Sequence, residues 1–224
     1  FHNADLSRSK LNGAILRRTD LKGSDLSEAD LNIADLTGAN LVGTKLTGAN
    51  LDRIKLNQAK LNGAQLSGAR MTKAKLAEVD LTHADLSGAN LTGAELNATL
   101  LEGADLSRAN LTEAILTDAN LKNAFLIGAN LQKADLQGVN LEGADMAGVK
   151  LRHASLKNAN LKQVDLRRAD LEHADFSKAN LSSANFTGAK MSEGLFIGAD
   201  LTGANMDSAE TTDTQFKGAV GFKA

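Results

Sequence analysis

The sequence predicts an all-β solenoid, in which a short repeat winds the chain into stacked coils. Three observations lead to this prediction. Every fifth residue from Phe1 to Met206 is Leu, Met or Phe, which gives 42 consecutive central positions, 34 of them Leu. The residue two places before a central position is usually Ala, and 18 of the 20 glycines stand two places after one. No insertion breaks this register, so the repeat contains no internal linker or domain boundary.

A five-residue period excludes a continuous helix and a straight strand. Five helical residues turn through about 140°, so leucines at this spacing would scatter around a helix. Side chains of a straight strand alternate between its two faces, and an odd period would put successive leucines on opposite faces. The leucines can share one interior only if the chain turns within every repeat. A glycine two places after each leucine suits the third position of a type II turn, where φ is positive.

The stretch "ADLSGANLTGAE", residues 84–95, contains the pattern A-[D/N]-L-x-x twice. This pattern covers almost the whole chain and resembles that of the pentapeptide-repeat family. The resemblance implies a right-handed quadrilateral parallel β-helix with four repeats in each coil and about eleven coils. In such a coil Leu86 and Leu91 point inward from adjacent walls, and Ala84 and Ala89 fill tight corners. Residues 20 apart should then be stacked neighbours.

The repeat is expected to form one domain with a cap. Residues 1–210 are predicted to form an uninterrupted solenoid, and the degenerate repeats of residues 211–224 to form a C-terminal cap, since solenoids need covered ends. The chain opens in mid-pattern at Phe1, which suggests a processed or trimmed form. An open first coil with an apolar Phe1 predicts end-to-end self-association of rods, because exposed edges invite pairing.

Composition excludes several classes of protein. The chain has no Cys, so a disulfide framework and a thiolate metal site are excluded. Its 25 basic and 27 acidic residues give no overall charge that would indicate nucleic acid as a partner. No apolar run approaches the roughly 18 residues that span a bilayer. We expect a soluble, cytoplasmic protein with no membrane partner.

The sequence offers no catalytic or metal-binding constellation. His153 and His173 are expected to be stacked neighbours, but Lys133 and Glu193 continue their column, and a lysine is a poor neighbour for a cation. No Ser pairs with a His and an acid in a recognisable motif. The stacked carboxylates recur because the repeat prefers Asp or Asn before the central residue. We expect no enzyme, no cofactor, no metal and no small-molecule substrate.

An amide ladder is expected along one wall. Four asparagines fall in one column, each a full coil from the next, and stacked asparagines stabilise other β-solenoids and fibrils. They are Asn120, Asn140, Asn160 and Asn180.

Charge is distributed in bands, and one band suggests a docking site. Residues 45–75 hold seven basic residues and one acidic residue, net +6, whereas residues 78–118 hold eight acidic residues and one basic residue, net −7. A focused basic patch is a candidate site for docking an acidic partner. The bland alternative is solvated charge without a partner. The candidate docking residues, which should share one corner across two coils, are Arg53, Lys55, Lys73 and Lys75.

Two pairs of apolar residues suggest a weaker candidate for a contact surface. Phe125 and Ile127 flank an inward Leu126, and Leu195 and Ile197 flank an inward Phe196. Single exposed apolar residues need no functional explanation, but paired ones are consistent with protein contact.

Two functional readings follow. The first is a non-catalytic rigid solenoid that acts as a structural scaffold or a protein–protein interaction module, with another protein as partner. The alternative comes from the resemblance, which implies for some members a DNA mimic that binds a type II topoisomerase such as gyrase. The net charge of −2 and the net +6 band depart from the acidic rod that such a mimic requires. Nucleic-acid binding through the basic patch is disfavoured, because no aromatic residue is interleaved with it for base stacking.

Overall fold

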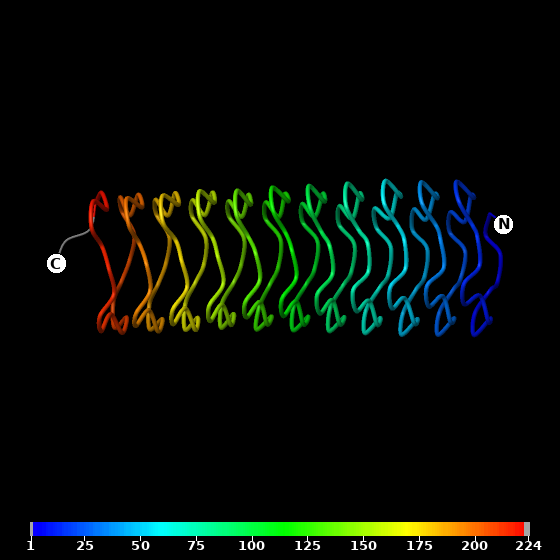
Figure 1. Ribbon diagram of the computed structural model, residues 1–224, viewed down its shortest axis with the longest axis horizontal. Helices are drawn as coiled ribbons and strands as arrows, with labels where there is room; N and C mark the ends of the chain where they lie inside the picture. Colours follow the sequence, from blue (N-terminus) through cyan, green and yellow to red (C-terminus); the bar gives the residue numbers. More distant parts are fainter. Residues whose placement is uncertain (1, 222–224) are drawn as a thin grey trace.

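The chain forms a straight rod of stacked coils (Figure 1). The computed structural model describes residues 2–221. Successive coils follow one another from the N-terminal to the C-terminal end and lie nearly directly over one another. Each coil therefore has only the preceding and the following coil as neighbours, as in other solenoids.

The register between coils is four pentapeptide repeats. Parallel bridges join each residue to its equivalent four repeats later, at every fifth position, from Asp5↔Asp25 to Asp200↔Val220. Between the bridges lie turns, so residues 2–221 contain isolated bridges but no continuous strand and no helix. The predicted stacking of residues 20 apart is confirmed. The handedness and the number of coils stay predictions.

Backbone hydrogen bonds between coils hold each repeat. In a typical repeat, Leu91 N–H donates to Asn110 O of the next coil at 2.7 Å, and Glu95 N–H donates to Ala74 O of the preceding coil at 2.9 Å. Ala94 N–H donates to Leu91 O at 3.0 Å, which closes the turn. The main chain of an interior coil is thus bonded on both sides, which satisfies its buried polar groups.

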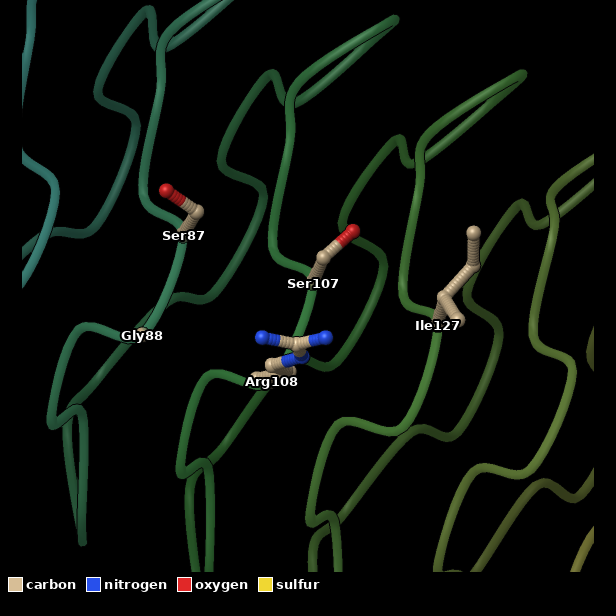
Figure 2. A pocket seen from close by; sticks show the side chains of 5 residues that line it. All are labelled: Ser87, Gly88, Ser107, Arg108 and Ile127. Carbon is tan, nitrogen blue, oxygen red and sulfur yellow. The ribbon is translucent and has the colours of Figure 1, made fainter.

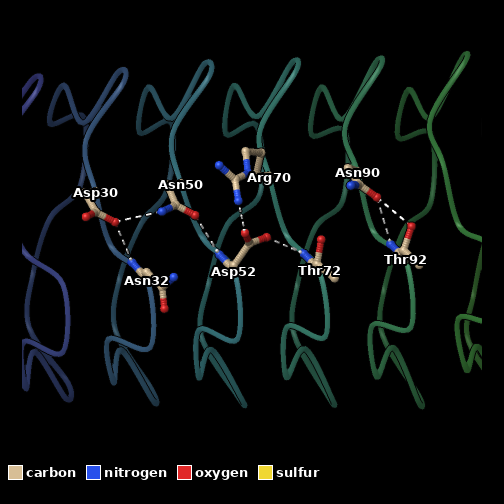
Figure 3. Close-up of polar contacts among 8 residues, drawn as sticks. All are labelled: Asp30, Asn32, Asn50, Asp52, Arg70, Thr72, Asn90 and Thr92. Atoms are coloured by element: carbon tan, nitrogen blue, oxygen red, sulfur yellow. Dashed lines mark hydrogen bonds and ion pairs between the residues drawn. The ribbon is translucent and has the colours of Figure 1, made fainter.

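Where Asp or Asn stands directly before a central residue, its side-chain oxygen accepts a backbone N–H that no hydrogen bond between coils uses. Asn90 Oδ1 accepts Thr92 N–H at 3.2 Å and the Thr92 hydroxyl at 2.6 Å (Figure 3). Asp85 accepts Ser87 N–H at 2.9 Å in the same way. Short polar side chains form such bonds to a backbone N–H two residues on. The repeat's preference for Asp or Asn therefore has a local structural cause.

The turns keep one backbone conformation whether or not glycine is present. The third residue of every turn from Asn3 to Gly218 has a positive φ, between 53° and 72°. Among the described residues, 26 with a positive φ are not glycine, and they include the β-branched Ile33 at φ 54°. A left-handed backbone costs a non-glycine residue about 1–2 kcal/mol. From the sequence we expected the positive φ where glycine is present. The structure shows the same backbone conformation at this position with other residues too.

The core consists of the central residues and the corner alanines. Leu86 is 0% exposed and Ala84 is 1% exposed, as their inward positions predict. Two corners carry a buried threonine instead of alanine. The hydroxyls of Thr44 and Thr99 donate to the carbonyls of Leu21 and of Leu76, at 3.1 and 2.7 Å. A buried hydroxyl is tolerated at a corner because a carbonyl of the preceding coil accepts its proton.

Phenylalanines fill the core near the C-terminal end. The ring of Phe196 stacks on Phe176 at 4.8 Å and on Phe216 at 5.4 Å between centroids. Gly194 occupies the corner where the repeat usually has Ala. A Cβ at Gly194 would lie 2.9 Å from Met191 O and 3.1 Å from Phe196 Cε2, so the backbone carbonyl and the ring both crowd this corner.

The structure does not test the predicted C-terminal cap or the role predicted for Phe1. Turns and bridges continue to Val220, where Thr211 is exposed and Phe216 is half-buried. The boundary at residue 210 and the cap of residues 211–224 stay predictions. Phe1, to which we assigned end-to-end association, and residues 222–224 of the cap lie outside the described residues.

Candidate functional site

The four candidate docking residues flank one edge of the rod in two adjacent coils. Lys55 and Lys75 are joined by a parallel bridge at the start of one wall. Arg53 and Lys73 occupy equivalent places in these coils at the end of the preceding wall, each as the third residue of a turn, at φ 56° and 54°. Buried Ile54 makes the corner between the two walls. The structure therefore brings the four together, and we call them the basic cluster.

The charges of the basic cluster have no ionic partner of their own. All four side chains are exposed, and within residues 2–221 none lies within 4.0 Å of a carboxylate. Lys55 acts at longer range on Asp35. The Thr37 hydroxyl and amide, together with nearby Arg17 and Lys55, hold the pKa of Asp35 below its usual range. Like charges stacked at about 4.8 Å repel one another, so the cluster costs stability.

A hollow of about 560 Å³ opens beside the cluster and includes residues that the sequence did not single out. Asp52 is one of its lining residues, and Arg70 donates to that carboxylate at 2.5 Å. Asp52 Oδ1 also accepts Thr72 N–H of the next coil at 2.9 Å (Figure 3). The lining residues are Asn32, Asp52, Arg53, Arg70, Thr72 and Lys73.

Arg70 explains why Asp52 has this role. Arg70 stands directly before its central residue, where Asp or Asn normally supplies an oxygen to the amide two residues on. An arginine has no acceptor to offer. Asp52 of the preceding coil supplies the oxygen to Thr72 instead and neutralises Arg70. The sequence signal for the arrangement is a basic residue directly before a central residue, with an acid directly after the equivalent central residue of the preceding coil.

The apolar candidates do not form one surface. Phe125 is 49% exposed and Ile127 44%, while Ile197 is 37% exposed and Leu195 is half-buried. Phe125 bridges to Asp105 and Asp145 in its own column, whereas Leu195 bridges to Asp175 and Gln215. The two pairs are fourteen repeats apart, which is not a whole number of four-repeat coils, so they lie on different walls. The members of each pair are neighbours, but the two pairs are not.

The histidine column forms contacts of an ordinary surface ladder. The rings of His153 and His173 stack with centroids 4.7 Å apart, and His173 Nδ1 lies 3.4 Å from a Glu193 oxygen. Lys133 pairs with Glu113 at 3.8 Å at the other end of the column. Across residues 2–221, no three His, Cys, Asp or Glu side chains gather so that they could hold a metal ion.

The predicted amide ladder is confirmed for three of its four members. Asn140 Nδ2 donates to Asn120 Oδ1 at 3.1 Å, and Asn160 Nδ2 donates to Asn140 Oδ1 at 3.0 Å. Asn180 joins the column through its backbone bridge to Asn160. These contacts stabilise a wall and leave no reactive group free.

The described part of the chain contains no helix that could cross a membrane.

Comparison with known proteins identifies the repeat. The family model named "Pentapeptide repeats" matches in eight copies, in overlapping segments that together run from residue 1 to residue 220. The chain is similar to HetL, a pentapeptide repeat protein involved in heterocyst differentiation regulation from the cyanobacterium Nostoc sp. strain PCC 7120. The identity is 36%, the TM-score is 0.66, and the match covers 94% of this chain and 91% of HetL. No curated protein sequence matches the chain.

Two other solved structures show more distant similarity. QnrB1, a plasmid-mediated fluoroquinolone resistance protein, has 21% identity and a TM-score of 0.42 over 70% of this chain and 90% of its own. Rfr23, a pentapeptide repeat protein from the cyanobacterium Cyanothece 51142, has 26% identity and a TM-score of 0.37 over 61% of this chain and 90% of its own. The family match across residues 1–220 and the 36% identity to HetL show that the chain belongs to the pentapeptide-repeat family.

Proposed function

We propose that this protein is a non-catalytic, rigid solenoid that serves as a scaffold or protein–protein interaction module, and that its basic cluster docks an acidic segment of a partner protein. The observation that carries the proposal is the set of four exposed cations, Arg53, Lys55, Lys73 and Lys75, without an ion pair in the described part of the chain. Serine, threonine, glycine and asparagine occupy equivalent wall positions elsewhere, so the fold does not require a cation there.

The regularity of the walls supports a binding role rather than catalysis. Side chains on a wall stand in parallel ranks at the coil spacing of about 4.8 Å, whereas catalysis needs groups of different chemistry aimed at one reacting atom. HetL is involved in the regulation of heterocyst differentiation, and a binding module is compatible with a regulatory role of this kind.

Binding of a defined acidic probe tests the proposal. The probe is a poly-glutamate peptide, with a poly-glutamine peptide of equal length as the neutral control. The test variant replaces Arg53, Lys55, Lys73 and Lys75 with serine. The control variant removes the same charge by replacing four exposed basic residues that form no ion pair within residues 2–221 and lie apart from one another: Lys10, Arg18, Lys162 and Lys190.

The parent and the control variant should bind poly-glutamate, and binding should weaken as salt rises, because exposed charge pairs are screened beyond about 10 Å at 0.1 M. The test variant should bind at least tenfold more weakly while its thermal midpoint stays the same or rises. Equal loss in both variants would mean that net charge alone matters, and no loss in the test variant would mean that the cluster is solvated decoration. Either result contradicts the docking proposal.

The DNA-mimic alternative requires a continuous acidic surface. The basic cluster interrupts the acidic stretches of residues 20–35 and 78–118, so the surface does not favour this alternative. A gyrase supercoiling assay at stoichiometric protein should show neither inhibition nor protection from inhibitors.

The proposal also includes the finer description of the rod. We take its coils to be right-handed and quadrilateral, about eleven in number, which accords with the general preference for right-handed crossovers. Its cap at residues 211–224 and a cytoplasmic location belong to the same proposal.

A further inference from the structure

We propose that two copies of this chain form a parallel dimer through the wall that carries Phe125 and Ile127. This inference does not rest on the basic cluster, whose residues lie on other walls. Each coil contributes three outward residues to the dimer wall. They form a leading column just after one corner (Asp85, Asp105, Phe125, Asp145, Asp165), a middle column (Ser87, Ser107, Ile127, Ala147, Arg167) and a trailing column at the next corner (Gly88, Arg108, Gly128, Gly148, Arg168).

Within residues 85–168 the leading and trailing columns complement each other coil by coil. Asp105 in the leading column shares its coil with Arg108 in the trailing column, and Asp165 shares its coil with Arg168. Where the leading column instead carries bulky Phe125, the trailing column carries a glycine, Gly128. Asp85 and Asp145 are likewise matched by glycines in their coils. Every long leading side chain in this stretch is thus matched by an opposite charge or by an empty position.

A twofold axis parallel to the rod uses this match twice. Rotation about such an axis lays the wall of one copy on the same wall of the other, with each coil facing its own equivalent. The leading column then faces the trailing column of the second copy, and the middle column lies close to the axis. A twofold interface repeats each contact in both directions, so every complementary pair counts twice.

Hollows in the trailing column lie on both sides of the apolar pair. One of about 460 Å³ is lined by Ser87, Gly88, Ser107, Arg108 and Ile127 (Figure 2). The other, of about 540 Å³, is lined by Ala147, Gly148, Arg167, Arg168 and Thr187. Figure 2 shows Ser87, Ser107 and Ile127 in one rank across three coils, with Gly88 and Arg108 in the rank beside it. The hollows leave room for the Asp85 and Asp145 side chains of a second copy, which would face Gly88 and Gly148.

The glycines of this wall are not filled from within the chain. A Cβ at Gly88, Gly128 or Gly148 would meet no atom within 4 Å. On the neighbouring wall a Cβ at Gly103 would run into His83 and one at Gly143 into Asn123, whereas Gly63 is as open as the three glycines of the dimer wall. The positive φ of the turn favours glycine at this position on every wall, and at these three positions the glycines also leave open space in front of the wall.

The charges that would meet across the axis are available. Arg108 and Arg168 are exposed, and within the described residues neither lies within 4.0 Å of a carboxylate. The half-buried Asp105 carboxylate accepts the Ser107 N–H at 2.8 Å through one of its two oxygens. Asp165 is already held by Arg167 in its own chain at 2.5 Å, so Asp105 with Arg108 is the stronger pair.

An antiparallel dimer on the same wall would be disfavoured. A twofold axis across the rod, placed between the coils of Phe125 and Asp145, would face each column with itself in reverse order. Arg108 would then meet Arg168 of the second copy, and Asp105 would meet Asp165. Like charges directly opposed are repulsive. Charge thus selects the parallel arrangement.

Charge reversal tests the parallel pairing, with mass measured by sedimentation across a concentration series. The single variants Asp105→Arg and Arg108→Asp each place like charges on both columns of that coil. Each should associate at least tenfold more weakly than the parent. A one-to-one mixture of the two variants should regain the dimer, because each then supplies the charge that the other lacks. The combined variant D105R/R108D should also dimerise.

Three results would overturn the proposal: a parent that stays monomeric throughout the series, single variants that dimerise as the parent does, or a mixture that remains monomeric. Unchanged circular dichroism of the single variants shows that loss of the dimer is not loss of the fold.

The empty trailing position tests the shape match independently. Gly128→Gln places a long side chain where Phe125 of the second copy would sit, and it should abolish the dimer. Gly63→Gln on the neighbouring wall is the matched control, because both glycines have a φ near +65° and no atom within 4 Å of an added Cβ. The control should keep the dimer. A G128Q variant that dimerises like the control would contradict the proposed packing.

Discussion

The carboxylate of Asp52 accepts the backbone N–H of Thr72 in the next coil at 2.9 Å, and so replaces an acceptor that the repeat of Thr72 lacks. The same carboxylate pairs with Arg70, the residue that stands in the acceptor's usual place. One side chain thus repairs a backbone defect and neutralises the residue that causes it.

Replacement of Asp52 by alanine should lower stability measurably. Thr72 N–H would lose its acceptor and Arg70 its partner, which costs about 1–3 kcal/mol for a hydrogen bond to a charged group. Asp52→Asn keeps an acceptor oxygen and should cost less. Hydrogen exchange should show faster exchange at the Thr72 amide in D52A only. Glu95→Ala, which removes a carboxylate without a hydrogen bond or ion pair in the described residues, serves as the control, and equal effects of D52A and E95A would contradict this role.

Leu100→Asn should stabilise the rod. Leu100 is 47% exposed and occupies the position before a central residue, where asparagine would accept the Glu102 N–H. It also bridges to Asn120, so an asparagine here would extend the amide ladder by one coil. The new hydrogen bonds should add about 0.5–1.5 kcal/mol, seen as a higher thermal midpoint. Leu100→Ala removes the apolar side chain without adding an acceptor, and an equal gain in L100A would show that the acceptor is irrelevant.

Gly194→Ala should be destabilising although alanine is the usual corner residue. The added methyl would lie 3.1 Å from the ring of Phe196 and 2.9 Å from the Met191 carbonyl. Overpacking of this kind costs about 1–3 kcal/mol. Phe196→Leu removes the contact with the ring but not the one with the Met191 carbonyl, so G194A should cost less, but still something, in an F196L background. A double-mutant cycle in urea measures the coupling, and additive effects would mean that the ring is not the cause.

Acid should destabilise the fold through the carboxylates that bond the turns. Hydrogen bonds from Thr37 hold the pKa of Asp35 below its usual range, and hydrogen bonds from Thr202 do the same for the pKa of Asp200. A carboxyl whose folded-state pKa is depressed stabilises the fold above the unfolded-state pKa of about 4. That contribution is lost as the pH falls through the folded-state pKa.

The thermal midpoint should therefore be constant from neutral pH to about pH 5 and fall below about pH 4. Asp35→Asn retains an acceptor that cannot be protonated, so the acid-induced fall should be smaller in D35N than in the parent. Asp118→Asn, at an exposed carboxylate without a hydrogen bond in the described part of the chain, should leave the profile unchanged. A parent-like fall in D35N would contradict the assignment.

Much of the fold could be predicted because a five-residue period fits neither a helix nor a straight strand and requires a turn in every repeat. Inward Leu86, corner Ala84 and the stacking of residues 20 apart follow from the period and the resemblance, and the structure confirms them. The role of Asp52 was harder to foresee, because it depends on a basic residue in the next coil rather than on its own repeat. Phe125 and Leu195 lie on different walls, which can be seen from the sequence only by dividing their separation by the four repeats of a coil.

The site could be predicted only as a grouping of charge. Residue numbers place Arg53 beside Lys73, but whether their charges are paired depends on side-chain reach. Lys45, in the same basic stretch, reaches Asp25 at 3.7 Å, whereas Lys73 reaches no acid in the described residues. Side-chain direction at a turn is not encoded in the repeat, so the unpaired members of the stretch appear only in the structure.

The four-repeat register has a consequence for how such a chain can change length. Loss of one pentapeptide unit leaves the interior intact, since every remaining leucine and alanine keeps its inward place. Every outward residue beyond the deletion, however, moves a quarter-turn around the rod. Deletion of residues 61–65 would carry Lys73 away from Arg53 onto a different wall, and only deletions of whole coils preserve the columns. The loss of a single pentapeptide unit is therefore nearly neutral for folding but disruptive for recognition. Evolutionary change in repeat number is thus constrained by the surface and not by the core.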